Sequence, residues 1–232
     1  MTTLTDRALL KLLAWLSPSF PVGAYAYSHG CEYAVERGQI FDYASAQSWT
    51  TFILEFGSGR IDADLFVATY RAVEQNDFDK FMQISTQADA LKGTSELGLE
   101  ARAQGQAFID GVLRAWPDDK ISMFSKLLKT HNIKPSYAVS VAVAAATSNI
   151  DLQAALAAYL HAFGANIVSA IVRLVPLGQT DGQKIIASLE PVIERSLAES
   201  LARCSDDLGS AAFGVDLMSM KHETQYSRLF RS

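Results

Sequence analysis

Apolar residues recur at helical spacing along most of this chain. The stretch between Asp42 and Gly57 places its apolar residues on one helical face: Ala46, Trp49, Phe52, Ile53 and Phe56. The same spacing predicts further helices at approximately 62–73, 78–91, 97–116, 119–131 and 137–146. No run of β-branched residues alternates with polar ones between turn signals, so we expect no sheet. The pattern predicts an all-α protein, a single-domain bundle of about ten helices.

Capping residues and helix breakers mark where these helices begin and end. Asp42, Asp118 and Asp151 stand where a side chain accepts a backbone N–H of the first turn. Asp6 is placed in the same way before a first helix that ends ahead of Pro18. Asp62 and Asp64 are predicted to lie at a helix N-terminus, where negative charge is favourable. Helix ends are predicted at Gly38, Gly57, Gly59, Pro117 and Pro176.

The C-terminal part of the chain differs in composition. The last predicted helix runs from about Asp181 to Cys204, with a kink at Pro191. Beyond it, glycines, serines and aspartates predict a poor helix. We therefore divide the chain into a helical domain, residues 1–204, and a flexible, irregular C-terminal tail, residues 205–232.

Two apolar stretches imitate membrane or export signals. Residues 152–172 carry no formal charge and are long enough to cross a bilayer. They are alanine-rich and include polar residues, so we predict a helix buried on all sides of a bundle. The N-terminal run 8–16 is interrupted by Lys11, and Asp6 offsets its positive end, which favours an amphipathic helix over an export signal.

Composition and charge narrow the class of protein. The chain has 232 residues, 49% of them hydrophobic, and a net charge of −5. A chain of this size buries enough surface to fold without disulfides. Its acidic balance argues against a general nucleic-acid binder. Two cysteines, Cys31 and Cys204, suggest a reducing, cytoplasmic setting.

Motifs for catalysis and cofactor binding are missing from the sequence. It contains no GxxxxGK[ST], GxGxxG, GxSxG or Glu-x-x-His pattern, so we predict a non-enzyme without a cofactor. His29 and Cys31 are spaced to touch one ion, but two ligands do not make a closed site. His222-Glu223 begins a zinc-protease motif, yet position 226 is tyrosine. We therefore predict no metal site.

Three stretches, spread over nearly the whole chain, carry a family resemblance. They are Leu16–Glu32, Arg173–Gln179 and His222–Ser232. In their order and spacing they resemble the urease accessory protein F family, UreF, and Glu96 and Gly105 also fit it. Cys31 stands where the family often has leucine, and Gly98 where arginine is common. Neither position is therefore assigned a family function.

The resemblance implies a non-catalytic, all-helical, dimeric chaperone. Proteins of this family join the accessory protein UreD, also called UreH, to the nickel-carrying GTPase UreG, and deliver nickel to apo-urease. An alternative role is activation of GTP hydrolysis by UreG, for which Arg173 and Arg228 would be the candidate residues. An uncharacterised helical enzyme is a third reading.

Partner contacts are expected at the end of the chain. Leu229 and Phe230 lie between two arginines; burial of each apolar side chain would contribute about 1.5–3 kcal/mol. The alternative is that this segment packs on its own helices or frays. The expected partner-binding residues are Tyr226, Arg228, Leu229, Phe230, Arg231, Ser232, Arg173 and Gln179.

The proline-glycine loop is assigned a structural role. Pro18 and Pro21 fix its backbone, and Gly23 permits a tight bend. The resemblance implies that this region supports a dimer or partner surface through Pro18, Pro21, Gly23, Tyr25, Tyr27, Ser28, Gly30 and Glu32.

Overall fold

A computed structural model describes residues 4–203 and 207–232. These residues form twelve α-helices and one short 3-10 helix, with no strand among them. The all-α prediction is confirmed. In chain order the elements are α1 (Asp6–Trp15), η1 (Ala24–Ala26), α2 (Cys31–Glu36), α3 (Tyr43–Phe56), α4 (Ser58–Gln75), α5 (Phe78–Ala90), α6 (Ser95–Ala115), α7 (Asp119–Thr130), α8 (Tyr137–Thr147), α9 (Leu152–Leu174), α10 (Gln179–Ser188), α11 (Glu190–Ala202) and α12 (Phe213–His222).

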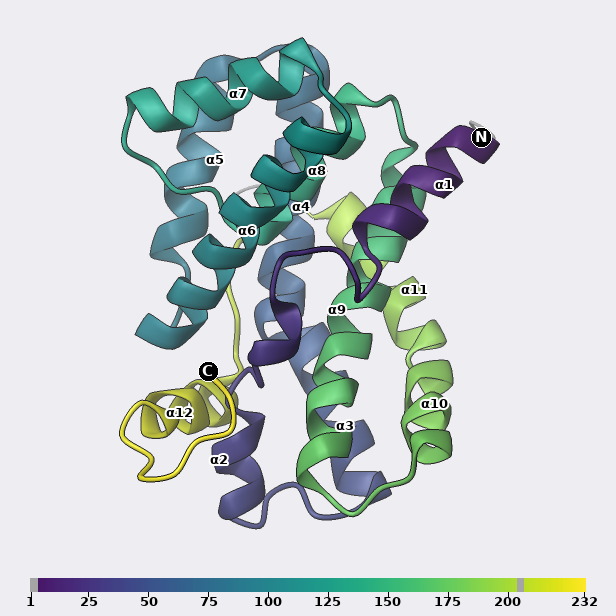
Figure 1. The fold of residues 1–232 in the computed structure, drawn as a ribbon, viewed down its shortest axis with the longest axis vertical. Helices are drawn as coiled ribbons and strands as arrows, with labels where there is room; N and C mark the ends of the chain where they lie inside the picture. Colours follow the sequence, from purple (N-terminus) through teal and green to yellow (C-terminus); the bar gives the residue numbers. More distant parts are fainter. Residues whose placement is uncertain (1–3, 204–206) are drawn as a thin grey trace.

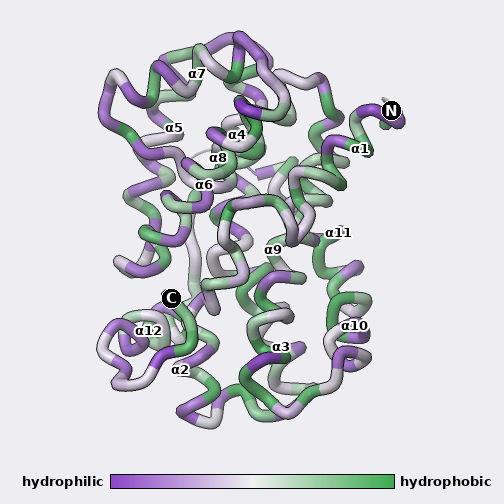
Figure 2. Tube along the Cα trace, viewed as in Figure 1, coloured by the Kyte–Doolittle hydropathy of each residue, from purple (hydrophilic) through white to green (hydrophobic). Residues whose placement is uncertain are grey.

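Two long helices, α4 and α9, connect the upper and lower parts of the molecule (Figure 1). In that view α5, α6, α7 and α8 lie above, and α2, α3, α10 and α12 lie below. α4 packs against α3, α5, α8, α9 and α11. Nearly every helix carries both apolar and polar residues (Figure 2). The buried apolar residues form one large core and one smaller cluster around Phe81 and Phe124.

Most of the predicted caps are confirmed. Asp42, Asp118 and Asp151 each accept a backbone N–H of the helix that follows. α1 is capped differently, because Thr5 Oγ1 accepts the N–H of Ala8 at 3.2 Å, and Asp6 lies inside the first turn.

Asp62 and Asp64 do not lie at a helix end. α4 begins at Ser58, directly after Gly57, so both aspartates fall within the helix. Each is buried and held in an ion pair, Asp62 with Lys92 and Asp64 with Arg203, both at 2.6 Å.

The last predicted helix is two helices. α10 ends at Ser188 and α11 begins at Glu190, with Pro191 in the first turn of α11. Proline has no N–H and clashes with the carbonyl four residues earlier, so the helix restarts instead of kinking. Cys204, the predicted end, lies outside the described residues.

α9 is long and apolar enough to cross a membrane, yet it packs in the interior of this fold. Half of its most apolar window is buried, and it contacts α2, α3, α4, α8, α10 and α11. The prediction of burial on all sides is wrong in part, because Gln153, His161 and Ser169 are exposed.

The C-terminal tail also differs from its prediction, since Phe213–His222 forms α12. Val215, Ser219 and His222 recur at i, i+4 and i+7 and are buried. α12 packs on α2 and α6 through this narrow face, so tertiary contact overrides the weak helical composition. The division of the chain at residue 204 stays a prediction.

Gly105 sets the closest approach between two core helices. A Cβ on Gly105 would lie 2.2 Å from the carbonyl oxygen of Pro135, just before α8. Ser140 on α8 donates a hydrogen bond to the Gly105 carbonyl at 2.9 Å. α6 is therefore held tightly against α8.

Candidate functional site at the C-terminal segment

The C-terminal segment, residues 223–232, folds back on its own chain beside α2, α6 and α12. Its position depends on Gly30, the residue before α2. Gly30 has φ +77°, and a Cβ there would lie 2.9 Å from the backbone nitrogen of Ser219 on α12. Glycine thus permits both the left-handed backbone and the close packing of α2 on α12.

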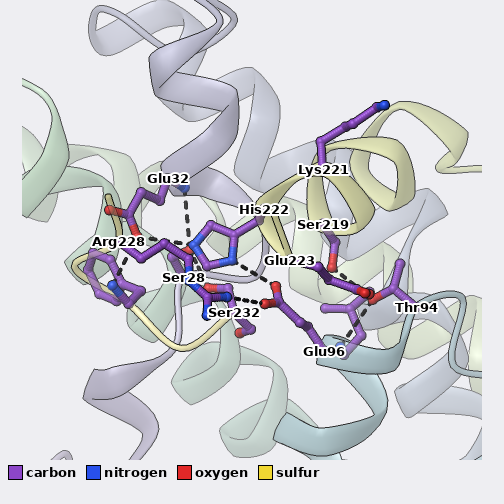
Figure 3. A network of polar contacts seen from close by, with 12 residues as sticks. Ser28, Glu32, Thr94, Glu96, Ser219, Lys221, His222, Glu223, Arg228 and Ser232 are labelled. Carbon is purple, nitrogen blue, oxygen red and sulfur yellow. Dashed lines mark hydrogen bonds and ion pairs between the residues drawn. The ribbon is translucent and has the colours of Figure 1, made fainter. Parts of the chain in front are cut away.

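His222 lies at the centre of this site and is completely buried. Its Nδ1 is 2.7 Å from Glu96 Oε2 on α6, and its Nε2 is 3.1 Å from Glu32 Oε2 on α2 (Figure 3). One imidazole therefore joins the end of α12 to two carboxylates from separate parts of the chain.

Glu32 also binds the backbone of the C-terminal segment. It accepts the N–H of Leu229 at 2.6 Å and the N–H of Phe230 at 2.9 Å. A carboxylate that accepts several N–H groups is a strong anchor, because hydrogen bonds to a charged acceptor are stronger than neutral ones.

Arg228 is held by the other carboxylate. Its Nη1 lies 2.7 Å from Glu96 Oε1, while Glu96 Oε2 faces His222. Glu32, Glu96, His222 and Arg228 form what we call the carboxylate clamp (Figure 3).

The last residues are anchored by further contacts. Phe230 is only 4% exposed, and the Arg173 guanidinium lies 4.4 Å from the centre of its ring, a cation–π contact. Ser232 is buried; its Oγ donates to Glu100 Oε2 at 2.8 Å, and its main-chain oxygen accepts from the N–H of Ser28 at 2.7 Å.

Part of the segment faces solvent. Tyr226 is fully exposed and Leu229 is 68% exposed. Phe213, Leu217 and Met220 add exposed apolar side chains on the outer face of α12. The site thus presents a firmly held apolar surface, a geometry suited to binding a protein.

The proline-glycine loop lies next to this segment. Arg231 donates its N–H to the carbonyl of Ala26 at 2.8 Å. Gly23 has φ +73°, which confirms the predicted tight bend. Tyr25 is exposed, whereas burial raises the pKa of the Tyr27 hydroxyl, an effect that the nearby Arg231 charge partly offsets. Pro18 and Pro21 are exposed on the loop.

Gln179 is the one predicted partner residue that lies apart from the others. It is the first residue of α10 and is exposed. α10 and α12 lie on opposite sides of the lower part of the ribbon (Figure 1). The structure brings Arg173 and the segment together and leaves Gln179 on a different surface.

A small polar pocket adjoins the clamp. His29 Nε2 is 2.9 Å from Ser58 Oγ, and its Nδ1 is 3.5 Å from Glu100 Oε2. The pocket also contains Asp62, which accepts a hydrogen bond from Tyr159. Among the residues with described positions, no three His, Cys, Asp or Glu side chains are placed to share a metal ion.

Cys31 lies in the hydrophobic core. The thiol is buried, and this burial raises its pKa well above the usual range. It is accordingly protonated at neutral pH and packs as a small apolar group.

Three residues of the site have no functional role in the sequence analysis: His222, Glu96 and Glu100. Glu96 stood out only as a family position, and His222 only as part of an incomplete zinc motif and as the first residue of the third family stretch. The available signal was the spacing of Glu96 and Glu100, which places two carboxylates on one face at the start of a helix.

Comparison with known proteins gives a consistent result. A sequence model of the family described as UreF matches residues 40–190. A protein of Bradyrhizobium sp. strain BTAi1, named urease accessory protein UreF, is 44% identical over 100% of this chain and 95% of its own length. Proteins of the same name from Rhodopseudomonas palustris strain HaA2 and Granulibacter bethesdensis are each 44% identical, over 97% and 98% of this chain and 94% and 95% of their own lengths.

Proposed function

The chain belongs to the UreF family of urease accessory proteins, and we propose that it is the scaffold that bridges UreD/UreH and the GTPase UreG during nickel insertion into apo-urease. It acts as a non-catalytic chaperone, a homodimer in the cytoplasm. It functions through the surfaces that bind other proteins.

The main support for this proposal is the anchored C-terminal segment. Binding by a free tail would lose free energy to ordering, at a cost of about 2–5 kcal/mol. Here Glu32, Glu96 and Glu100 already hold the segment, so Tyr226 and Leu229 are presented in a fixed place. Such exposed apolar anchors on a rigid support are typical of protein interfaces.

Co-expression with UreD and UreG, followed by measurement of complex size, tests the proposal. We expect one complex containing all three proteins, and the chain alone to have about twice its mass of 25.3 kDa. A chain that binds neither partner would refute the scaffold.

A double substitution tests the exposed apolar surface of the C-terminal segment. Tyr226→Ala with Leu229→Ala should weaken UreD binding at least tenfold, since each lost anchor contributes about 1 kcal/mol or more. Leu13→Ala with Phe41→Ala removes two exposed apolar side chains elsewhere on the surface and serves as the control. Equal effects of the two pairs would contradict the assignment.

Activation of GTP hydrolysis by UreG is the second candidate. An arginine supplied to the phosphates would have to leave its present partner, Phe230 for Arg173 or Glu96 for Arg228. GTP turnover by UreG with and without the chain separates the two functions. Unchanged turnover with binding retained supports the scaffold alone.

A further inference from the structure

The two ring nitrogens of buried His222 both face carboxylate oxygens (Figure 3). A neutral imidazole has one N–H donor and one lone pair. If both carboxylates are ionised, a neutral ring would direct its lone pair at a carboxylate oxygen. The geometry therefore requires a second proton on the ring, or on the Glu96 oxygen next to it.

Glu32 is the less suitable holder of that proton. Its two oxygens accept N–H groups from Leu229, Phe230 and His222, which calls for an ionised carboxylate. The contact left to hold that proton is the one between His222 Nδ1 and Glu96 Oε2, which lie 2.7 Å apart. Whichever atom carries it, the clamp contains one proton more than it would with a neutral ring and two ionised carboxylates.

The charges of the neighbouring side chains are consistent with one additional proton in the clamp. α2 contributes Glu32, α6 contributes Glu96, and the C-terminal segment contributes Arg228. An imidazolium at His222 makes the clamp neutral, with two negative and two positive groups. Outside it, Glu100 binds Ser232 and lies near His29, while Lys221 on α12 and Glu223 just after α12 flank His222 at exposed positions.

We propose that His222 is a positioning residue that couples docking of the C-terminal segment to the binding of one proton. Loss of that proton leaves two carboxylates opposed by Arg228 alone and breaks one of the contacts of Glu96 or Glu32. Docking therefore weakens as pH rises and this proton is lost. One proton per docking event changes the docking equilibrium by up to about tenfold per pH unit.

Presentation of Tyr226 and Leu229 to a partner then also depends on pH. This consequence rests on the proposed function, whereas the proton-linked clamp does not. The clamp is accordingly tested on the chain without partners, so failure of partner binding and failure of the clamp are separate results.

Amide hydrogen exchange of the full chain is the decisive experiment. Three backbone N–H groups report docking: those of Leu229 and Phe230, bonded to Glu32, and that of Arg231, bonded to Ala26. Between pH 6 and 9, their protection factors, corrected for intrinsic exchange, should fall by up to about tenfold per pH unit over part of the range. A flat profile overturns the proposal.

Glu96→Gln is the matched variant. Its amide oxygen accepts from Arg228 and its amide N–H donates to His222 Nδ1, so a neutral ring satisfies every contact. We expect the segment to stay protected without a pH slope. His131→Gln, at an exposed histidine, should keep the slope of the unmodified chain. A Glu96→Gln slope equal to that of the unmodified chain overturns the proposal.

A spectroscopic measurement covers the case in which Glu96→Gln does not dock. Nitrogen-15 spectra of the unmodified chain report the protons on the His222 ring. Where the segment is protected, we expect Nε2 to carry a proton and a second proton to lie on Nδ1 or on the Glu96 carboxyl that faces it. A protected segment with a bare Nδ1 lone pair opposite an ionised Glu96, read from the carbon-13 shift of its carboxyl group, refutes the clamp.

Discussion

Gly30→Ala is the sharpest test of how the C-terminal segment is held. The backbone at Gly30 is left-handed, with φ +77°, which costs an alanine roughly 1–2 kcal/mol. The added Cβ would also lie 2.9 Å from the nitrogen and 3.1 Å from the Cα of Ser219. These are backbone atoms of α12, so no side chain can rotate away.

The contact with α12 adds a second cost to Gly30→Ala. Overpacking of this kind costs roughly 1–3 kcal/mol, which brings the expected total loss to roughly 2–5 kcal/mol. Gly23→Ala is the control, since Gly23 has φ +73° and its Cβ would meet nothing within 4 Å. Gly23→Ala should therefore cost only the backbone part.

Urea unfolding of both variants gives the free energies, and amide exchange shows where the damage lies. In thermal unfolding, the melting temperature of Gly30→Ala should lie below that of Gly23→Ala by about 2–4 °C for each kcal/mol by which it is less stable. Exchange should quicken selectively over 213–232 in Gly30→Ala. If the two variants lose the same free energy and exchange alike, the packing of α2 on α12 is not what the geometry indicates.

Three further predictions address the anchors and the buried charges. Phe230→Ala removes a buried ring, so protection of the Leu229 and Arg231 amides should fall at least tenfold by hydrogen exchange while helical circular dichroism is kept. Lys92→Met leaves Asp62 buried without its cation and should cost about 3–5 kcal/mol in urea unfolding, part of which Asp62→Asn in the same chain should restore. Burial raises the pKa of Asp216, with the charge of His29 acting in the opposite direction. The folded state thus binds this proton more tightly than the unfolded chain, and stability is lost as pH rises from the ordinary aspartate pKa of about 3.9 through the raised value. Asp216→Asn should unfold at higher urea than the unmodified chain near pH 7 and lose that advantage below about pH 4; an equal advantage at both pH values would contradict this.

Local signals were sufficient for most of the helices. Asp42, Asp118 and Asp151 cap where their side chains predict, because a cap depends only on residues within one turn. The end of α6 before Pro117 follows from the same kind of local rule. Asp6 was misplaced by one residue, since Thr5 provides an equally suitable oxygen.

α12 and the clamp could not be predicted in this way. The buried face of α12 has only three residues, and it is stabilised by Gly30, far away in the sequence. His222 was assigned no role of its own, because its partners Glu96 and Glu32 are separated from it by 126 and 190 residues. The resemblance did mark Glu32, Glu96 and Arg228. It did not reveal that both glutamates face His222 or that Arg228 binds Glu96.

The tight crossing at Gly105 has a consequence for recognition. Gly105 lies nine residues from Glu96 along α6, about 13 Å, so a tilt of roughly 5° at the crossing would move that carboxylate by about 1 Å. Such a shift is enough to break hydrogen bonds of ordinary length. A loosely packed or partly folded molecule would therefore fail to form the carboxylate clamp and to hold the C-terminal segment in place. A partner that recognises this segment would then bind only well-folded molecules.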